Sequence, residues 1–135
     1  MNSFRLYSYY RKAEKEIHFG GATVEFKKDT VVLYEGYEYD DSDGDRILEG
    51  EDYYTIPGKF IERLLFLIPE EYKNESILSE YENVYDYYNS LTSDSEKILF
   101  ICILKYYKID QNFNKLLKIL DDYDIYYEHH EMRYP

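Results

Sequence analysis

The feature that most constrains this chain is residues 93–109, a segment that contains seven consecutive apolar residues, Ile98 to Leu104. Ser93 followed by Glu96 matches a capping box, in which the hydroxyl and the carboxylate satisfy the first backbone N–H groups of a helix. These residues predict a buried helix. Three of the apolar residues are β-branched isoleucines, so a buried strand is the alternative interpretation.

Length and the apolar run together predict one compact domain. Seven apolar residues are far fewer than the roughly 20 required to cross a bilayer, so the run is interpreted as core. At 135 residues the chain has the usual size of a single domain, and no apolar stretch follows a basic region near the N-terminus. We therefore expect one domain, residues 1–135, in the cytoplasm. Cys102 lies inside the apolar run and is expected to be a small buried side chain.

Periodicity changes along the chain from that of strands to that of helices. Residues 4–34 show alternating and β-branched segments, with a short loop at Lys28 and Asp29. Helical spacing of apolar residues begins after Pro57. We predict an α+β fold, in which an N-terminal antiparallel β-sheet of hairpins (about residues 4–56) packs on a C-terminal bundle of about four helices (57–68, 76–90, 94–108 and 111–123). Residues 125–134 fit a strand, a helix extension or a tail.

Side-chain orientations follow from these periods. In the first strand, Phe4 and Leu6 are expected on one side and Arg5, Tyr7 and Tyr9 on the other. A linker is expected at residues 11–16, and short strands at 46–48 and 53–56. Asp110 is expected to cap the last helix. In a continuous helix over 76–90, Tyr85 is expected in the buried stripe, and the outward residues are Glu80, Glu82, Asn83, Asp86 and Tyr87.

Negative charge is concentrated in one stretch. The formal net charge is −12, and residues 35–52 hold nine acidic residues against one basic residue, a net of −8. Binding of nucleic acid requires basic groups that neutralise phosphates, and an anionic membrane surface would repel this chain. We therefore exclude direct nucleic-acid and membrane partners and favour a basic protein, whose field would complement this one.

Tyrosine is the second unusual feature, with 19 residues and no tryptophan. Tyrosine supplies a large rigid ring and a hydroxyl, and binding surfaces use it for that reason. An A/T-rich genome, typical of many bacteria and phages, is the competing explanation. Its codons favour tyrosine, isoleucine and lysine over alanine, glycine and proline.

No motif for catalysis is present, so we predict a protein that is not an enzyme and has no cofactor. Two segments can be interpreted either as metal sites or as solvated chain. Asp41, Asp43, Asp45 and Asp52 have the spacing of an EF-hand loop, but Arg46 stands where that loop requires glycine. The run from Glu128 to Glu131 includes two histidines, yet adjacent histidines rarely point the same way. We predict no metal ligands in either place.

The function predicted from these features is that of an acidic inhibitor or immunity-type protein, from a bacterium or a phage. It would bind and block a basic partner that handles nucleic acid, such as a nuclease or toxin, and could act as a DNA mimic. Mimicry would need two acidic rows, one at Asp41, Asp43 and Asp45 and a second in the 76–90 helix. A calcium or metal module using the 40–52 loop, or a structural oligomer subunit, are the alternatives. The predicted partner-binding residues are Tyr37, Tyr39, Asp40, Asp41, Asp43, Asp45, Glu49, Glu51, Asp52, Tyr53, Glu80, Glu82, Asp86 and Tyr87.

Overall fold

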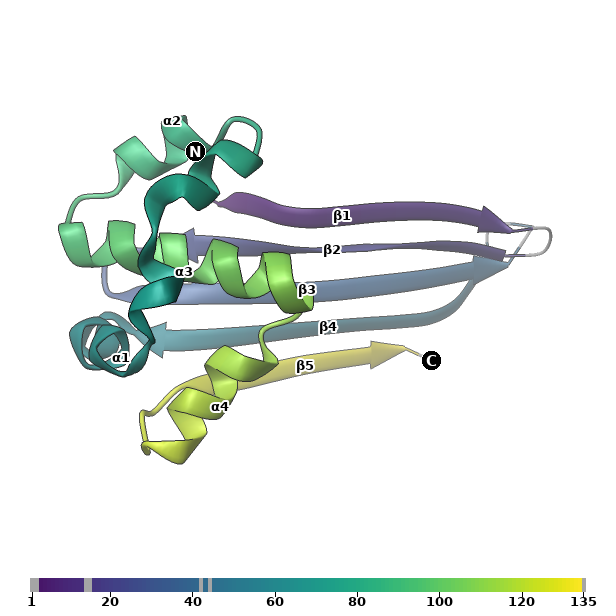
Figure 1. Cartoon of the computed structure of the whole chain (residues 1–135). Helices are drawn as coiled ribbons and strands as arrows, with labels where there is room; N and C mark the ends of the chain where they lie inside the picture. The colour runs from purple at the N-terminus through teal and green to yellow at the C-terminus, as the bar shows by residue number, and fades with distance from the viewer. Residues whose placement is uncertain (1–2, 14–15, 42, 44, 135) are drawn as a thin grey trace.

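The fold is α+β, as predicted, with one antiparallel sheet and a helical layer (Figure 1). The computed structural model describes residues 3–13, 16–41, 43 and 45–134. The sheet has five strands in the order β1-β2-β3-β4-β5, which are β1 Phe4–Ala13, β2 Glu16–Phe26, β3 Thr30–Asp41, β4 Arg46–Pro57 and β5 Glu128–Tyr134. The α-helices are α1 Ile61–Leu67, α2 Val84–Ser90, α3 Asp94–Asp110 and α4 Asn114–Asp122. The 3-10 helices η1 Gly58–Phe60, η2 Glu70–Lys73 and η3 Glu75–Glu80 precede α2.

Helix α3 is the centre of the core, as the apolar run predicted. Its capping box is formed, because Ser93 Oγ accepts a hydrogen bond from the Glu96 N–H at 3.1 Å and Glu96 Oε1 accepts from the Ser93 N–H at 3.3 Å. All side chains from Leu99 to Leu104 are buried. The ring of Phe100 meets that of Phe4 in β1, with 5.4 Å between centroids. This packing joins the helical layer to the sheet.

The described helices cover one end of one face of the sheet (Figure 1). The strand residues in the core cluster all lie at that end, and they are Phe4, Leu6, Ala22, Val24, Val31, Leu33 and Ile56. We call the other end the projecting half. It comprises residues 8–13, 16–21, 36–41, 46–51 and 131–134, and none of its described side chains belongs to the core cluster. The face of the sheet turned away from the helices, which we call the open face, has none of the described helices over it.

The strands are longer than predicted. The expected linker at residues 11–16 is mostly strand, although residues 14 and 15 lie outside the described part. The two short strands expected at 46–48 and 53–56 are one continuous strand, β4. In β1 the pairing shifts by one residue between Arg5 and Tyr7. That bulge turns Tyr7 and Tyr9 to the helix side with Phe4, so the predicted strict alternation is wrong there.

The predicted helix over 76–90 is interrupted. Asn83 adopts a left-handed conformation, with φ of 58°, and α2 begins anew at Val84. The helical faces before and after this break do not align. Tyr87, predicted to face outward, is therefore buried at 2% exposure, and its hydroxyl accepts a hydrogen bond from the Phe26 N–H at 2.9 Å. Tyr85, predicted to face inward, is 54% exposed.

The C-terminal residues 125–134, for which the sequence allowed a strand, a helix extension or a tail, contain a strand. Asp110 does not cap the last helix, because it ends α3, and α4 begins after Phe113. Beyond α4 the chain returns to the sheet as β5, which pairs with β4 from Glu128 to Tyr134. None of the described helices is both long and apolar enough to cross a membrane.

Candidate functional site

The open face carries a group of acidic and aromatic side chains that we call the acidic patch. It is formed by β3 and β4, and its members are Tyr34, Glu38, Asp40, Glu49, Glu51 and Tyr53. Because every second residue of a strand faces the same side, the hairpin register brings these residues together. Tyr34 lies opposite Tyr53, and Glu38 lies opposite Glu49. Like charges in directly opposed positions repel, so this arrangement favours binding of positive charge.

One positive side chain of the protein already occupies part of the acidic patch. Arg46 places Nη1 2.8 Å from Glu49 Oε2 and Nη2 3.5 Å from Glu38 Oε1. Burial and a hydrogen bond with Asp40 raise the pKa of Glu38, whereas the charge of Arg46 lowers it. Glu51 has no ion pair with any described residue, and Oδ1 of Asp40 is buried without a hydrogen-bond partner in the described part of the chain. The patch therefore retains acceptors that Arg46 does not satisfy.

A hollow of about 340 Å³ lies in the open face beside these acids. Its floor includes Gly21 and Gly36, which lie opposite each other on β2 and β3. Neither residue has a side chain, so the end of the Tyr34 side chain can lie against Gly36 and the backbone of Gly21 lines the hollow. We call this space the glycine hollow, and its walls include Arg5, Tyr34, Glu38, Glu49 and Glu51.

Tyr34 forms the aromatic wall of the glycine hollow. Its hydroxyl donates a hydrogen bond to Glu51 Oε1 at 3.1 Å, and its ring centroid lies 4.9 Å from that of Tyr53. Burial and the charge of Glu51 raise the pKa of Tyr34 to about 12. A β-carbon at Gly36 would overlap the Tyr34 hydroxyl, so glycine allows the ring to lie close to the sheet.

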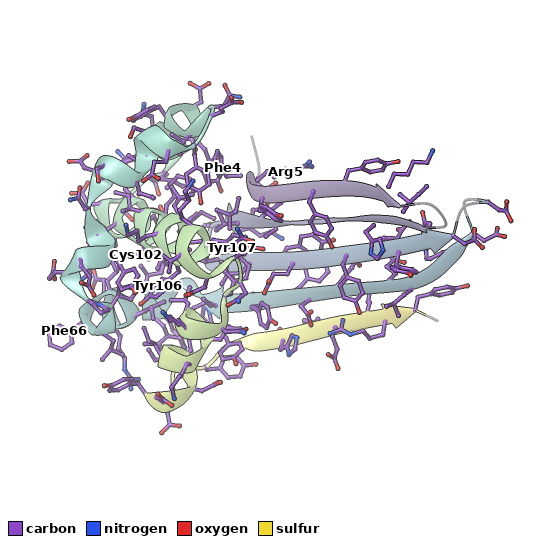
Figure 2. The ribbon with its side chains drawn as sticks, turned by 45° about the vertical axis from the view of Figure 1, so that its right-hand side comes forward. Phe4, Arg5, Phe66, Cys102, Tyr106 and Tyr107 are labelled. Carbon is purple, nitrogen blue, oxygen red and sulfur yellow. The ribbon has the colours of Figure 1, made fainter. Side chains whose placement is uncertain are left out.

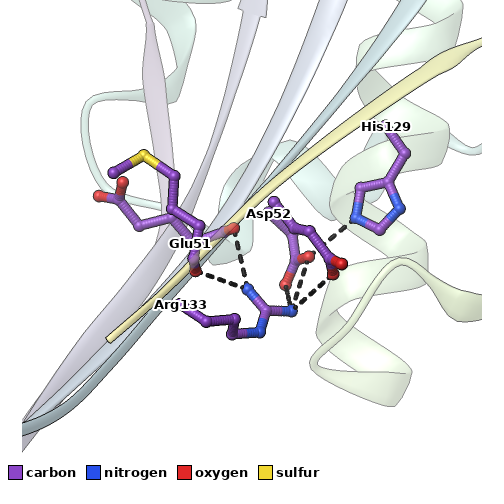
Figure 3. A network of polar contacts seen from close by, with 6 residues as sticks. Glu51, Asp52, His129 and Arg133 are labelled. Atoms are coloured by element: carbon purple, nitrogen blue, oxygen red, sulfur yellow. Dashed lines mark hydrogen bonds and ion pairs between the residues drawn. The ribbon is translucent and has the colours of Figure 1, made fainter. Parts of the chain in front are cut away.

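The helix-side face carries a separate charged network around Asp52 (Figure 3). His129 Nε2 lies 2.8 Å from Asp52 Oδ1, and Arg133 Nη2 lies 3.0 Å from the same oxygen. Arg133 Nη2 also lies 3.3 Å from Glu131 Oε2, and Arg133 Nη1 donates a hydrogen bond to the backbone carbonyl oxygen of Glu51 at 3.1 Å. Burial acts to raise the pKa of Asp52, but the hydrogen bonds and charges of His129 and Arg133 outweigh it, so the pKa is lowered. This network ties β5 to β4.

Glu35 is the neighbour of Asp52 on β3 and lies where α3 ends above the sheet. The two residues are directly paired in the register of β3 and β4. Both line a groove of about 500 Å³ together with Tyr7, Tyr54, Tyr107 and residues of the α3–α4 turn. Burial and the charge of Asp52 raise the pKa of Glu35 to about 7, although a hydrogen bond from the Phe113 N–H acts in the opposite direction. Glu35 therefore joins the sheet to the turn before α4.

Metal binding is weakly supported by this geometry. Among the described residues, Asp52, His129 and Glu131 have potential ligand atoms within 4.8 Å of one another. The guanidinium of Arg133 already contacts both carboxylates, and its positive charge opposes a metal cation there. The EF-hand set does not converge, because β4 runs extended from Arg46 to Asp52 and separates Asp52 from the β3–β4 turn by roughly 20 Å.

The remaining predicted acids of residues 35–52 lie at the tip of the projecting half. Asp41 Oδ1 accepts hydrogen bonds from the N–H groups of Asp43 and Asp45, both at 2.9 Å. These three residues close a tight turn and do not form the straight acidic row considered for DNA mimicry. Ser42 and Gly44, which were expected in this loop, lie outside the described residues.

The other predicted residues lie away from the acidic patch. Tyr37, Tyr39 and Asp52 are on the helix-side face, where the ring of Tyr39 meets His18 at 4.1 Å. Glu80, Glu82 and Asp86 are exposed in η3, α2 and the segment between them, at the helical end of the molecule. The structure does not place these three beside the acids of β3 and β4, so the second row expected for mimicry is at the opposite end. Figure 2 shows Phe66 at that end, pointing away from both layers, with 88% of its side chain exposed.

Several residues of the acidic patch and the glycine hollow were missed as site residues. Glu38 was counted in the acidic stretch but was not selected, and Tyr34, Gly21 and Gly36 were not considered. A period-2 interpretation of residues 34–40 would have placed Tyr34, Gly36, Glu38 and Asp40 on one face. That signal was passed over because residues 35–52 were divided into a loop and short strands.

Comparisons with models of protein families, with curated proteins and with solved structures found no match to this chain.

Proposed function

We propose that this protein is a non-enzymatic inhibitor or immunity-type protein, of a bacterium or a phage. In this proposal its open face binds a basic protein that handles nucleic acid and blocks that partner's active surface. The observation that carries the proposal is the acidic patch, in which carboxylates and tyrosine rings from β3 and β4 lie together on a face that none of the described helices covers.

The dimensions of the open face suit a protein interface. Five strands about 4.8 Å apart and about ten residues long, at about 3.3 Å per residue, present roughly 600–800 Å². Each partner in a stable complex of standard size contributes about 800 Å². Exposed aromatic and apolar residues extend the patch onto β5, where Met132 is 60% exposed and Tyr134 is 48% exposed.

The chemistry of the acidic patch suits a basic partner. Tyrosine rings are typical anchor residues of interfaces, and Tyr34 and Tyr53 lie among the carboxylates. Complementary charge speeds association and excludes acidic competitors. Asp43 and Asp45 at the exposed tip add to the field that steers a basic protein towards this half of the sheet.

The test compares two variants with the same change in charge. One variant carries Glu38→Gln, Glu49→Gln and Glu51→Gln in the acidic patch. The control carries Glu62→Gln, Glu71→Gln and Glu82→Gln at the helical end, where all three side chains are exposed. Proteins captured by the wild type from a bacterial lysate are identified, purified and titrated by calorimetry against each variant.

We expect the patch variant to lose at least about tenfold in affinity and the control to lose less than about threefold. The affinity of the wild-type protein for the partner should fall as the salt concentration rises. The wild-type protein should also inhibit the partner's action on nucleic acid. The proposal fails if the patch variant binds and inhibits as the wild type does. It also fails if DNA and this protein occupy the partner together, because the active surface is then not blocked.

A further inference from the structure

The glycine hollow is the most specific feature of the open face. We propose that it is a receptor for one arginine side chain, which the basic partner inserts between Tyr34 and the carboxylates of Glu38, Glu49 and Glu51. This inference rests on the proposed function, because it assigns the chemistry of recognition within the same surface.

The size and shape of the glycine hollow fit a single side chain. Its volume of about 340 Å³ is at the lower end of the range for ligand pockets, about 300–1,000 Å³. At Gly36 the end of the Tyr34 side chain lies where a β-carbon would be, so an entering group meets the Tyr34 ring there and the backbone of β2 at Gly21. Larger side chains at these positions would fill the space.

The walls favour a guanidinium over an ammonium group. A guanidinium is planar, stacks on aromatic rings and presents paired N–H donors to carboxylates, whereas an ammonium is a compact and strongly hydrated charge. Tyr34 offers the ring, and its hydroxyl holds Glu51 by the 3.1 Å hydrogen bond. Glu51 has no ion pair with a described residue and is available to a cation from outside.

Arg46 supplies an internal precedent for this chemistry. Its guanidinium bridges Glu38 and Glu49 at 3.5 Å and 2.8 Å, and it lies 5.8 Å from the ring centroid of Tyr134. The glycine hollow offers a similar set of groups, in which Glu51 and Tyr34 stand beside Glu49, the carboxylate that it shares with the Arg46 site. A second guanidinium would satisfy the carboxylate that Arg46 does not reach.

Substitution of Arg5 tests the direction in which the affinity for arginine changes. Arg5 lines the β1 side of the glycine hollow, and its side chain is exposed. A like charge on that wall opposes an entering arginine. Removing it with Arg5→Ser should therefore strengthen binding, although most substitutions in a binding site weaken it.

The experiment uses the whole protein labelled with ¹⁵N and two neutral-ended peptides, acetyl-Gly-Arg-Gly-amide and acetyl-Gly-Lys-Gly-amide. We expect the arginine peptide to shift the amide signals of Gly21 and Gly36 in a saturable way. The lysine peptide should bind at least about threefold more weakly, because it lacks the planar fork. Glu51→Gln should weaken the arginine peptide about tenfold, since a charge-assisted hydrogen bond is lost.

The matched control is the variant with Asp43→Asn and Asp45→Asn. These residues are seven and nine positions from Gly36 along the chain, at the strand tip, roughly 20 Å away. That distance exceeds the screening length of about 8 Å at physiological salt, so affinity for the arginine peptide should change by less than about twofold.

The outcomes separate this inference from the proposed function. Equal affinity for the two peptides, no saturable shift at the two glycines, or weaker binding by Arg5→Ser overturns the arginine receptor. If a basic partner is still bound through the acidic patch, the proposed function survives that result. If the arginine peptide binds as expected but no basic protein is captured and inhibited, the receptor stands and the proposed function fails.

Discussion

The two ends of the sheet differ in what lies against them. At the covered end, Val24, Val31, Leu33 and Ile56 are fully buried beneath the helices. The projecting half has the same strands and the same hydrogen-bonded register, but none of its described side chains belongs to the core cluster. Burial of apolar area is the main source of stability. The covered end therefore stabilises the fold, and the projecting half is free to carry charge and bare backbone.

This division explains why the acids accumulate where they do. A carboxylate at the covered end would lose its hydration, as the raised pKa of Glu35 shows at the boundary. In the projecting half none of the described helices covers either face of the sheet, and Arg46 bridges the opposed acids Glu38 and Glu49, which offsets their repulsion. Regions of low local stability are those in which binding surfaces commonly occur.

The prediction with the largest expected effect compares a substitution that creates a cavity at the covered end with one in the projecting half. Leu104 is fully buried in α3, and we expect Leu104→Ala to lower the free energy of unfolding by about 3–4 kcal/mol. Leu48 in the projecting half is 40% exposed, and Leu48→Ala should change the free energy of unfolding by less than about 0.5 kcal/mol. Urea denaturation of both variants measures the difference. Similar losses would mean that the projecting half contributes to the core.

The sequence predicted the covered end better than the projecting half. In the covered end the apolar run Ile98 to Leu104 and the Ser93–Glu96 capping box are local signals, and α3 formed as expected. In the projecting half, β3 and β4 owe their length to pairing with each other across the sheet. Acidic residues disfavour strands, so local preference pointed to a loop where the hairpin register decided the outcome.

The candidate site was predicted in its charge but not in its geometry. Of the acids of residues 35–52, only Glu38, Asp40, Glu49 and Glu51 share the open face, together with Tyr53. The others lie on the helix-side face or at the tip of the projecting half. Tyr87 was misplaced because the left-handed Asn83 breaks the helix, and no local residue pattern announced that break. The glycine hollow depends on the pairing of Gly21 with Gly36 across β2 and β3, which the register of the folded sheet determines and the local sequence does not.

The second test asks whether the projecting half can open alone. A β-carbon at Gly20 would overlap the backbone carbonyl oxygen of Gly36 on β3, so Gly20→Ala should force β2 and β3 apart and cost about 1–3 kcal/mol. Gly36→Ala overlaps only the movable end of Tyr34 and should cost less than about 1 kcal/mol. In the Gly20→Ala variant, amide hydrogen exchange should be faster in residues 16–21 and 36–41, whereas the amides of α3 should stay protected. Faster exchange throughout α3 would contradict independent opening.

A third and smaller test concerns the attachment of β5. Asp52→Asn removes the charge that holds His129 and Arg133, and we expect a loss of about 1 kcal/mol that is confined to β5. Because the pKa of Asp52 is lowered in the fold, its contribution is present above the usual aspartate pKa and is lost as pH falls. Amide exchange in residues 128–134 measures this effect. Exchange rates equal to those of the wild type at pH 7 would show that the backbone pairing alone holds β5.

The finest test lies at the boundary between the two halves, at Glu35. Its pKa is raised to about 7 in the fold from 4.5, so the folded protein holds the proton more tightly than the unfolded chain. Stability from this group is complete below pH 4.5 and is lost as pH rises through 7. Glu35→Gln keeps an oxygen that can accept from the Phe113 N–H but cannot ionise. The variant should therefore match the wild type at pH 4.5 and exceed its stability at pH 8.

Removing any negative charge from a chain of net charge −12 relieves some repulsion, so the pH series needs a reference. Glu62→Gln, at an exposed position in α1, measures that general effect. Urea midpoints of the three proteins at pH 4.5, 6 and 8 should separate Glu35→Gln from Glu62→Gln progressively. Parallel curves for the two variants would show that Glu35 is as well hydrated as a surface carboxylate, and that the helices do not seal this edge of the sheet.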